Sequence, residues 1–431
     1  MKNFFIGIVL FTNLITSTAI VKAEPLSIDA KAYILIDSKT GQVICEQNAD
    51  QKLYPASTTK IMTAILGIEN ADPEQIMTVS QYAIDNIGPG GMHVGLLNGE
   101  QLKFKDLLNA LLISSANETS YVVAENIGPT PEEFFKRMNE RARELGATNT
   151  NFVNPCGMDT DEAGKNHLST ARDLSLMAKH AMTLPLFRET VKKTSYILPS
   201  TNMHSEAYTL NSTNKLFTGE YSSKYYSEVT GIKTGFTSRA AFNLVSSAKN
   251  EAGMELISVI LGCPTKGVFQ ESKKLLEYGF KNYSLQNLVA PNSFVASTPV
   301  ANASYNPNLD ILAAEGFECV LPNDPDIWND ITEDVKMNTD ISAPIKKGAV
   351  LGSVEYKLDG VTLGKVDLIA SRDVEKIVIS PTPAQTVISD FNSSIFSKVL
   401  ATLFAVLVAF LGLRITLRKI SRHRRHNLKK L

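Results

Sequence analysis

The sequence predicts an α+β protein, with an antiparallel sheet that carries helices on both faces, then a small all-β domain and a C-terminal membrane helix. Strand-like segments lie near both ends of residues 24–283, with helical segments between them. Strands that are distant in the chain would therefore pair in one sheet. Helical spacing then disappears, and short apolar runs alternate with turns over 284–380. An apolar run at 395–415 follows.

The first region, 24–283, opens with a predicted hairpin, because AYILIDSKTGQVICEQN reads as two short strands around a Ser-Lys-Thr-Gly turn. Two further strands are predicted around Glu251-Ala252-Gly253. The predicted helices share apolar residues three or four positions apart, or a capping residue at their start. Five helices are predicted: one after Ser57, one over 104–114, one that begins at Thr130, one that begins at Thr170, and one over 268–280.

The N-terminus is typical of an export signal. Residues 1–23 have Lys2, then an apolar core, then a small-x-small ending at Ala23. This pattern predicts a cleavable signal peptide, with an uncleaved anchor as the alternative.

The C-terminus predicts a membrane anchor. Residues 395–415 carry one charge, Lys398, before Arg414, and this length spans a hydrocarbon layer of about 30 Å. By the positive-inside rule, the basic tail, 416–431, is predicted on the cytoplasmic side of the membrane. The acidic region before the anchor is then extracytoplasmic. Residues 381–394 have the composition of a linker. The alternative is an amphipathic helix lying in the membrane surface.

Charge and residue usage exclude several functions. Residues 24–397 carry 32 basic and 44 acidic residues, a net charge of −12, which is not a nucleic-acid-binding surface. The four cysteines are far apart and give no disulfide framework. The six histidines show no metal-ligand spacing, so neither a metal nor another cofactor is predicted.

Three short motifs occur in order along the first region: Ser57-Thr58-Thr59-Lys60, Ser115-Ala116-Asn117 and Lys233-Thr234-Gly235. Each motif alone is weak, because Ser246–Lys249 and Lys39-Thr40-Gly41 repeat two of the patterns elsewhere. Order and setting separate the trio from these copies. The first motif lies at a predicted helix start, the second in a loop after a helix, and the third in a strand.

The residue types suit nucleophilic catalysis. A serine hydroxyl needs an adjacent base, and a lysine serves if burial and a second cation lower its pKa. Lys60 lies one helical turn from Ser57, and Lys233 is the second cation. The backbone N–H groups at a helix start would stabilise a developing oxyanion.

The ordered trio resembles the penicilloyl-serine transferases, the superfamily of penicillin-binding proteins and serine β-lactamases. The sequence is most similar to the low-molecular-mass serine-type D-alanyl-D-alanine carboxypeptidases, through PASTTK, SSANETS, HLSTARD and GIKTGFTSRAAFNLVSSA over about 30–283. The resemblance implies a β-lactamase/transpeptidase-like catalytic domain. It also implies the β-rich second domain and the C-terminal anchor.

The resemblance implies a role for each motif residue. Ser57 attacks the carbonyl of the penultimate D-alanine, Lys60 takes the proton of Ser57, and Ser115 relays a proton to the leaving D-alanine. Asn117 binds the acyl side of the peptide. The remaining residues bind the leaving side and the oxyanion: Lys233 and Thr234 hold the terminal carboxylate, Gly235 admits the substrate backbone, and the N–H groups of Ser57 and Phe236 form the oxyanion hole.

Four residues depart from the family pattern, and none of them is expected to change the mechanism. Ala116 adds a methyl group, which matters only if the loop needs positive φ there. Phe236 contributes only its backbone. Arg239 is interpreted as solvated and Cys156 as a structural thiol.

Three alternatives remain open. A class A-type β-lactamase would need a deacylating glutamate, and Glu162…Asn166 has its spacing, but Lys165 indicates a solvated loop. A penicillin sensor would acylate at Ser57 without efficient turnover. An endopeptidase would use the same residues on cross-linked peptides.

The sequence thus predicts a membrane-anchored hydrolase that removes the terminal D-alanine from peptidoglycan stem peptides ending in D-Ala-D-Ala. β-Lactams are expected to inhibit it, because the lactam mimics the scissile amide and leaves a slow acyl-enzyme.

Overall fold

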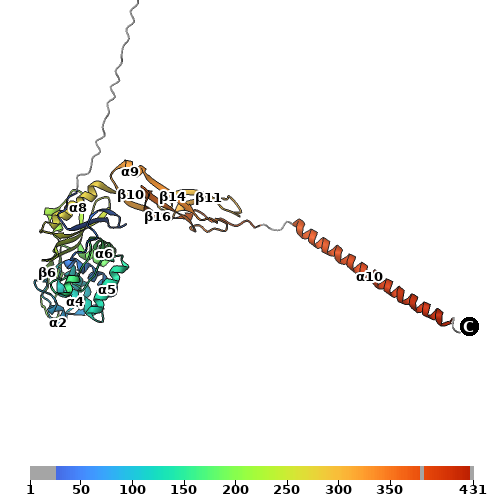
Figure 1. Cartoon of the computed structure of the whole chain (residues 1–431), viewed down its shortest axis with the longest axis horizontal. Helices are drawn as coiled ribbons and strands as arrows, with labels where there is room; N and C mark the ends of the chain where they lie inside the picture. The colour runs from blue at the N-terminus through green and yellow to red at the C-terminus, as the bar shows by residue number, and fades with distance from the viewer. Residues whose placement is uncertain (1–25, 379–382, 428–431) are drawn as a thin grey trace, which may run out of the picture. The chain divides into compact units, whose positions relative to one another are not determined.

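The computed structural model describes residues 26–378 and 383–427, so the predicted signal peptide lies outside the described residues. The chain divides into two compact units. The first comprises the chain up to Ala290, Gly316–Asp334 and Glu355–Lys365. The second comprises Pro291–Glu315, Val335–Val354 and the chain from Val366 onward. Figure 1 follows the elements along the chain.

The first unit is built on a five-stranded antiparallel sheet of order β2-β1-β9-β8-β7. The predicted pairing of distant strands is confirmed, since β1 pairs antiparallel with β9, with Ile36 opposite Ile257. The strands are β1 (Ala32–Asp37), β2 (Val43–Gln47), β7 (Glu228–Thr237), β8 (Ala241–Lys249) and β9 (Glu255–Cys263).

The prediction of only two strands around the 251–253 turn was wrong by one strand. A second turn separates β7 from β8, where the Thr237 hydroxyl accepts a hydrogen bond from the Ala240 N–H and Ala241 has a φ of +58°. A side-chain hydroxyl that accepts a hydrogen bond from a nearby backbone N–H stabilises a turn, and the strand ends there.

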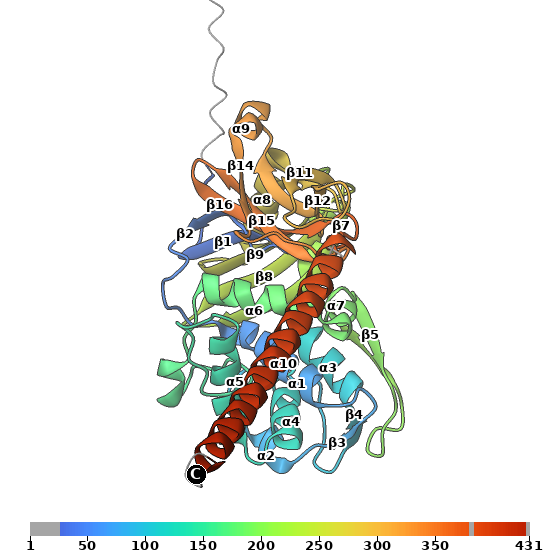
Figure 2. The same ribbon diagram turned by 90° about the vertical axis from the view of Figure 1, so that its right-hand side faces the viewer.

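Helices cover both faces of this sheet, as predicted. Alternate residues of β1 enter different cores: Ile34 and Ile36 join the larger one, and Tyr33 and Leu35 join the smaller one. In Figure 2, α6 crosses the sheet on the side of the large helical layer, while α8 lies with the opposite face.

The helices of the first unit begin and end at recognisable signals. Thr130 and Thr170 are the predicted N-caps, and their hydroxyls accept hydrogen bonds from the N–H groups of Glu133 and Asp173. The helices are α1 (Lys60–Asn70), α2 (Gln81–Asp85), α3 (Phe104–Leu112), α4 (Asn117–Ile127), α5 (Pro131–Glu144), α6 (Ala171–Thr183), α7 (Pro185–Val191) and α8 (Val268–Asn282).

Shorter elements complete the first unit around this framework. Two small hairpins are formed by β3 (Ile76–Thr78) with β4 (Gln101–Lys103) and by β5 (Ser195–Leu198) with β6 (Tyr208–Asn211). The 3-10 turns are η1 (Ala56–Thr59), η2 (Ala163–Asn166), η3 (Lys215–Phe217) and η4 (Gly219–Tyr221).

The region after α8 is rich in strands, as expected, but is not wholly β. A short helix, α9 (Pro325–Asn329), starts at Asp324, whose side chain caps it. One sheet pairs β10 (Tyr283–Val289) with β13 (Phe317–Pro322). The other has the order β11 (Phe294–Pro299), β12 (Asn308–Ala313), β16 (Val361–Ala370), β15 (Val350–Leu358), β14 (Ile331–Met337).

The C-terminal helix α10 runs over Pro383–Asn427. It therefore includes most of the segment 381–394 that the sequence predicts as a linker. Proline is tolerated in the first turn of a helix, where its missing N–H has no partner to lose. One apolar span, Ile395–Ser421, is long enough to cross a membrane and has a mean hydropathy of 2.3.

Candidate active site

Ser57 lies in η1, the tight turn that leads directly into α1. Ala56, just before it, has a φ of +48°, which is uncommon for a residue with a side chain. The turn packs against β7 at Gly235, where a Cβ atom would lie 3.0 Å from the carbonyl oxygen of Pro55 and 3.2 Å from the Ser57 nitrogen. Gly235 thus allows the strand to approach the serine turn, a packing reason beside the substrate role predicted for it.

Lys60 is the first residue of α1 and is fully buried. Its Nζ lies 3.0 Å from Ser57 Oγ, 2.7 Å from Asn117 Oδ1 and 2.9 Å from the carbonyl oxygen of Cys156. Burial lowers the pKa of Lys60 to about 8. A substantial fraction of this amine is therefore neutral near physiological pH.

Ser115 and Asn117 lie between α3 and α4. Ser115 has a φ of +63° and is 4% exposed, whereas Ala116 has an ordinary φ of −59°, so its methyl group brings no strain. The Asn117 side-chain amide donates to the carbonyl of Ile87 at 2.7 Å, and its backbone N–H donates to Met92 at 2.8 Å. Asn117 thereby joins Lys60 to the loop that precedes β4.

Lys233 and Thr234 lie in β7, the edge strand of the sheet. The Lys233 side chain is buried, and its Nζ donates to the Thr234 carbonyl at 3.0 Å. Burial first, and the neighbouring Lys60 second, hold the pKa of Lys233 well below its usual range. The Thr234 hydroxyl lies 2.7 Å from the Thr213 hydroxyl.

These residues surround one cavity of about 370 Å³. Phe236, 56% exposed, lies at this cavity and packs against Phe242, with ring centroids 4.4 Å apart and the rings tilted by 33°. Lys60 and Lys233 lie beneath the cavity surface rather than in its lining. The predicted site residues that line it are Ser57, Ser115, Asn117, Thr234, Gly235 and Phe236.

Sequence reasoning missed Glu118, which is fully buried. Its Oε1 accepts a hydrogen bond from the Val94 N–H at 2.7 Å, while Oε2 has no partner among the described residues. Burial raises the pKa of Glu118. Together with Asn117, it fastens the loop whose Gly90, Gly91 and Met92 line the cavity. The glycine-rich stretch 88–99 was the only sequence signal for this wall.

His167 was also missed. It is fully buried behind Lys60, with Nε2 2.7 Å from the Thr59 hydroxyl and Nδ1 accepting from the Val153 N–H at 3.1 Å. Burial, and then the charge of Lys60, lower the pKa of His167 to about 3. A neutral histidine therefore supports the turn that carries Ser57.

Three other interpretations can be compared with the structure. Cys156 is a buried free thiol whose pKa is raised by burial, in agreement with a structural role, although its carbonyl oxygen contacts Lys60. Arg239 is exposed, yet its guanidinium donates to the Asp159 carbonyl. The Glu162 side chain is 87% exposed and pairs with Lys165 at 2.6 Å, outside the cavity, as expected for a solvated loop.

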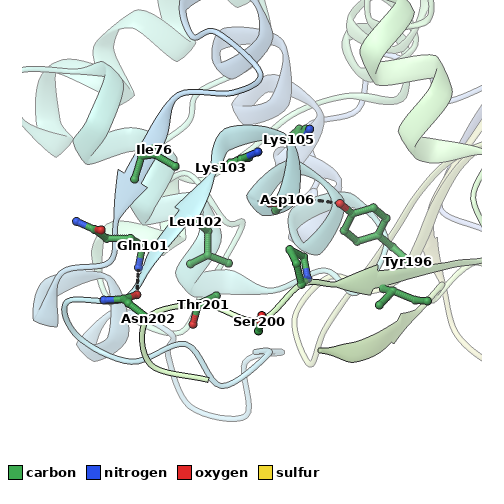
Figure 3. Close-up of a pocket in the computed structure, with 12 residues that line it drawn as sticks. Ile76, Gln101, Leu102, Lys103, Lys105, Asp106, Tyr196, Ser200, Thr201 and Asn202 are labelled. Carbon is green, nitrogen blue, oxygen red and sulfur yellow. Dashed lines mark hydrogen bonds between the residues drawn. The ribbon is translucent and has the colours of Figure 1, made fainter. Parts of the chain in front are cut away.

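A second cavity, of about 590 Å³, is larger but lacks the motif residues (Figure 3). There the Tyr196 hydroxyl donates to Asp106 at 2.5 Å, and Lys103 and Lys105 both pair with Glu74. Its polar groups are thus largely satisfied by one another, so size alone does not make it the catalytic site.

The fold and the serine–lysine cavity define the chain as a penicillin-binding protein by class. A family model described as D-alanyl-D-alanine carboxypeptidase matches residues 18–265, more than half of the chain. A second model, the C-terminal domain of penicillin-binding protein 5, matches 283–376. The chain belongs to the D-alanyl-D-alanine carboxypeptidase family, hydrolases of peptidoglycan metabolism.

Individual relatives extend over most of the chain. D-alanyl-D-alanine carboxypeptidase DacF of Bacillus subtilis is 33% identical over 87% of this chain and 94% of its own length. D-alanyl-D-alanine carboxypeptidase DacC of Escherichia coli is 32% identical over 82% and 86%. The crystal structure of penicillin-binding protein 5 from Haemophilus influenzae matches with a TM-score of 0.67 and 28% identity, covering 82% of this chain and 99% of that one.

Proposed function

We propose that this carboxypeptidase works through an acyl-enzyme on Ser57, with Lys60 as the general base. The observation that carries the proposal is the set of three oxygen atoms within 3.0 Å of Lys60 Nζ. A neutral amine has two N–H bonds and one lone pair. If the two N–H groups donate to Asn117 and to the Cys156 carbonyl, the lone pair faces the Ser57 hydroxyl and can take its proton.

Acylation then forms a bond between Ser57 Oγ and the carbonyl carbon of the penultimate D-alanine. The developing oxyanion is stabilised by the N–H groups of Ser57 and Phe236, the latter in an edge strand with an open side. The C–N bond breaks, and Ser115 passes a proton to the departing D-alanine amine. Water, activated by Lys60, finally cleaves the ester and restores Ser57.

The remaining residues bind substrate. The Thr234 hydroxyl contacts the terminal carboxylate, and Lys233 attracts it from beneath the cavity surface. Asn117 has two N–H groups on its side chain and uses one for Ile87, so the other remains for the acyl side of the peptide. A β-lactam enters the same cavity and acylates Ser57, which makes the enzyme sensitive to penicillin.

We also propose the domain boundaries and the location. The catalytic domain is 24–283 and the β-rich domain 284–380, behind a signal peptide over 1–23. The chain crosses the membrane once through α10. Its basic C-terminal end lies in the cytoplasm and the catalytic domain on the opposite side.

The test is D-alanine release from diacetyl-L-Lys-D-Ala-D-Ala by the full chain in detergent, beside Ser57→Ala. Release by the parent alone supports the mechanism. Equal release by both proteins would exclude Ser57 as the nucleophile. If the parent is labelled at Ser57 by fluorescent penicillin but releases no D-alanine, the protein is a penicillin sensor instead.

A further inference from the structure

Two lysines that the proposed mechanism does not use line the catalytic cavity. Lys215 lies in η3 and Lys266 lies just before α8, and both line the cavity. Both residues are exposed. Among the described residues, neither side chain forms an ion pair or a hydrogen bond. Two cations thus face the cavity without compensation.

None of the described residues that line this cavity is an aspartate or a glutamate. A cleft lined by one sign of charge attracts ligands of the other sign. The single carboxylate of a departing D-alanine has Thr234 and Lys233 as its proposed partners, so Lys215 and Lys266 are in excess of what that group requires.

The position of the two lysines assigns them to the leaving-group side. Thr213, two residues before Lys215, contacts the Thr234 hydroxyl at 2.7 Å. Asn117, which is proposed to hold the acyl side, also lines the cavity, but its side chain bonds Lys60 and Ile87 rather than this group. The lysines therefore lie on the Thr234 side of the scissile bond.

The neighbouring lining, from η4 and the start of α8, is apolar. Tyr221, Val268 and Phe269 line the cavity there and are less than 10% exposed, with the rings of Tyr221 and Phe269 5.8 Å apart. Such a surface suits methylene groups, and the two ammonium groups suit an anion at the end of a methylene chain.

We infer that the leaving-group subsite binds an amino acid longer than alanine, with a second carboxylate at the end of its side chain. The inference rests on the proposed function, because it uses the same nucleophile and the same hydrolysis. Water supplies OH to the D-alanyl carbonyl and H to the departing amine, as with D-alanine itself. The same serine then also opens bonds at which the released residue is an acidic amino acid longer than alanine.

The test compares four diacetyl-L-Lys-D-Ala-D-X peptides, with X as alanine, glutamate, glutamine or lysine. D-Glutamine has nearly the shape of D-glutamate without the charge. For the full chain in detergent we expect kcat/KM to be about five- to tenfold higher for D-glutamate than for D-glutamine, and lower still for D-lysine. Added salt should reduce this preference.

The matched variants are Lys215→Gln/Lys266→Gln and the control Lys224→Gln, an exposed lysine on the same segment that does not line the cavity. The double variant should lose the preference for D-glutamate while releasing D-alanine within about twofold of the parent, as expected for weak exposed ion pairs. The control should keep the preference.

Several results would overturn the inference while leaving the proposed function intact. These are equal rates for D-glutamate and D-glutamine in the parent, or a preference that persists in the double variant. An equal fall for D-alanine and D-glutamate would instead assign the lysines to the terminal carboxylate. No release of the terminal amino acid from any of the four peptides, with no labelling of Ser57, would refute the proposed function and the inference together.

Discussion

The side-chain oxygen of Asn117 accepts a hydrogen bond of 2.7 Å from Lys60 Nζ, across 57 positions of sequence. The two residues come from different motifs, and the bond fixes the orientation of the proposed base. Because the other N–H group of Lys60 has the Cys156 carbonyl as its acceptor, Asn117 helps to decide which direction the lone pair takes.

Asn117→Ala should therefore slow acylation of Ser57 by fluorescent penicillin by about ten- to a hundredfold, the usual cost of losing a hydrogen bond to a group that becomes charged. Asn126→Ala, on the same helix but away from the cavity, is the control. The rate of labelling measures the effect. An unchanged rate in Asn117→Ala would show that Lys60 is oriented without it.

The rate of acylation of Ser57 should depend on pH through the protonation of Lys60. Lys60 has a pKa of about 8, and only its neutral form accepts a proton. The second-order rate constant for penicillin labelling should rise as pH increases through about 8 and level off above it. The measurement runs from pH 5.5 to 10, with spontaneous hydrolysis of the penicillin followed in parallel. A rate that is flat across this range would contradict a lysine base.

Glu118 should act through the loop that it holds. Glu118→Gln keeps an acceptor for the Val94 N–H, whereas Glu118→Ala removes it and leaves a cavity. We expect labelling of Ser57 to be slowed much more by alanine than by glutamine, by about tenfold or more between the two. An equal loss of rate in both variants would mean that the carboxylate charge, rather than the hydrogen bond, is what the site needs. Parental rates in both would show that the site needs neither.

His167 should make the fold sensitive to acid. Its folded-state pKa of about 3 lies below the value of an unfolded histidine, so its contribution to stability is complete above about pH 6.5 and is lost as pH falls towards 3. Each pH unit in this window costs about 1.4 kcal/mol. Thermal unfolding followed by circular dichroism should show a fall in the midpoint from pH 7 to 4.

His167→Gln is the matched variant for this prediction. It should be less stable than the parent at pH 7, by about 1–3 kcal/mol, because one of two buried hydrogen bonds is disturbed. Its midpoint should change less between pH 7 and 4. A parent and a variant with parallel pH profiles would assign the acid sensitivity to other groups.

The sequence was sufficient for the parts of the site that lie within short motifs. Ser57 and Lys60 are three residues apart, and helical geometry alone brings them together. The same holds for the caps at Thr130 and Thr170, which are local. The second S-x-x-K pattern, which begins at Ser246, is not part of the site. Ser246 is buried and shares hydrogen bonds with the hydroxyls of Ser258 and Ser272.

The residues that were missed act through contacts between distant segments. The Cys156 carbonyl reaches Lys60 across 96 positions, and His167 reaches Thr59 across 108. A backbone carbonyl has no sequence signature, and a single histidine on an apolar background looks like any core residue. The turn between β7 and β8 is held by the Thr237 hydroxyl, which accepts a hydrogen bond from the Ala240 N–H. The composition of this segment does not show whether it forms a turn or continues the strand.

The pairing of β1 with β9 has a consequence for how the chain reaches its site of action. One side of β1 pairs with β9, with Ile36 opposite Ile257. That side of β1 therefore has no partner until residues 255–263 have been made. Closing so long a loop is slow compared with forming local helices. For the export proposed above, the chain has to stay unfolded in a translocation pore. This order of events favours that, because the central sheet cannot form before residues 255–263 have been made.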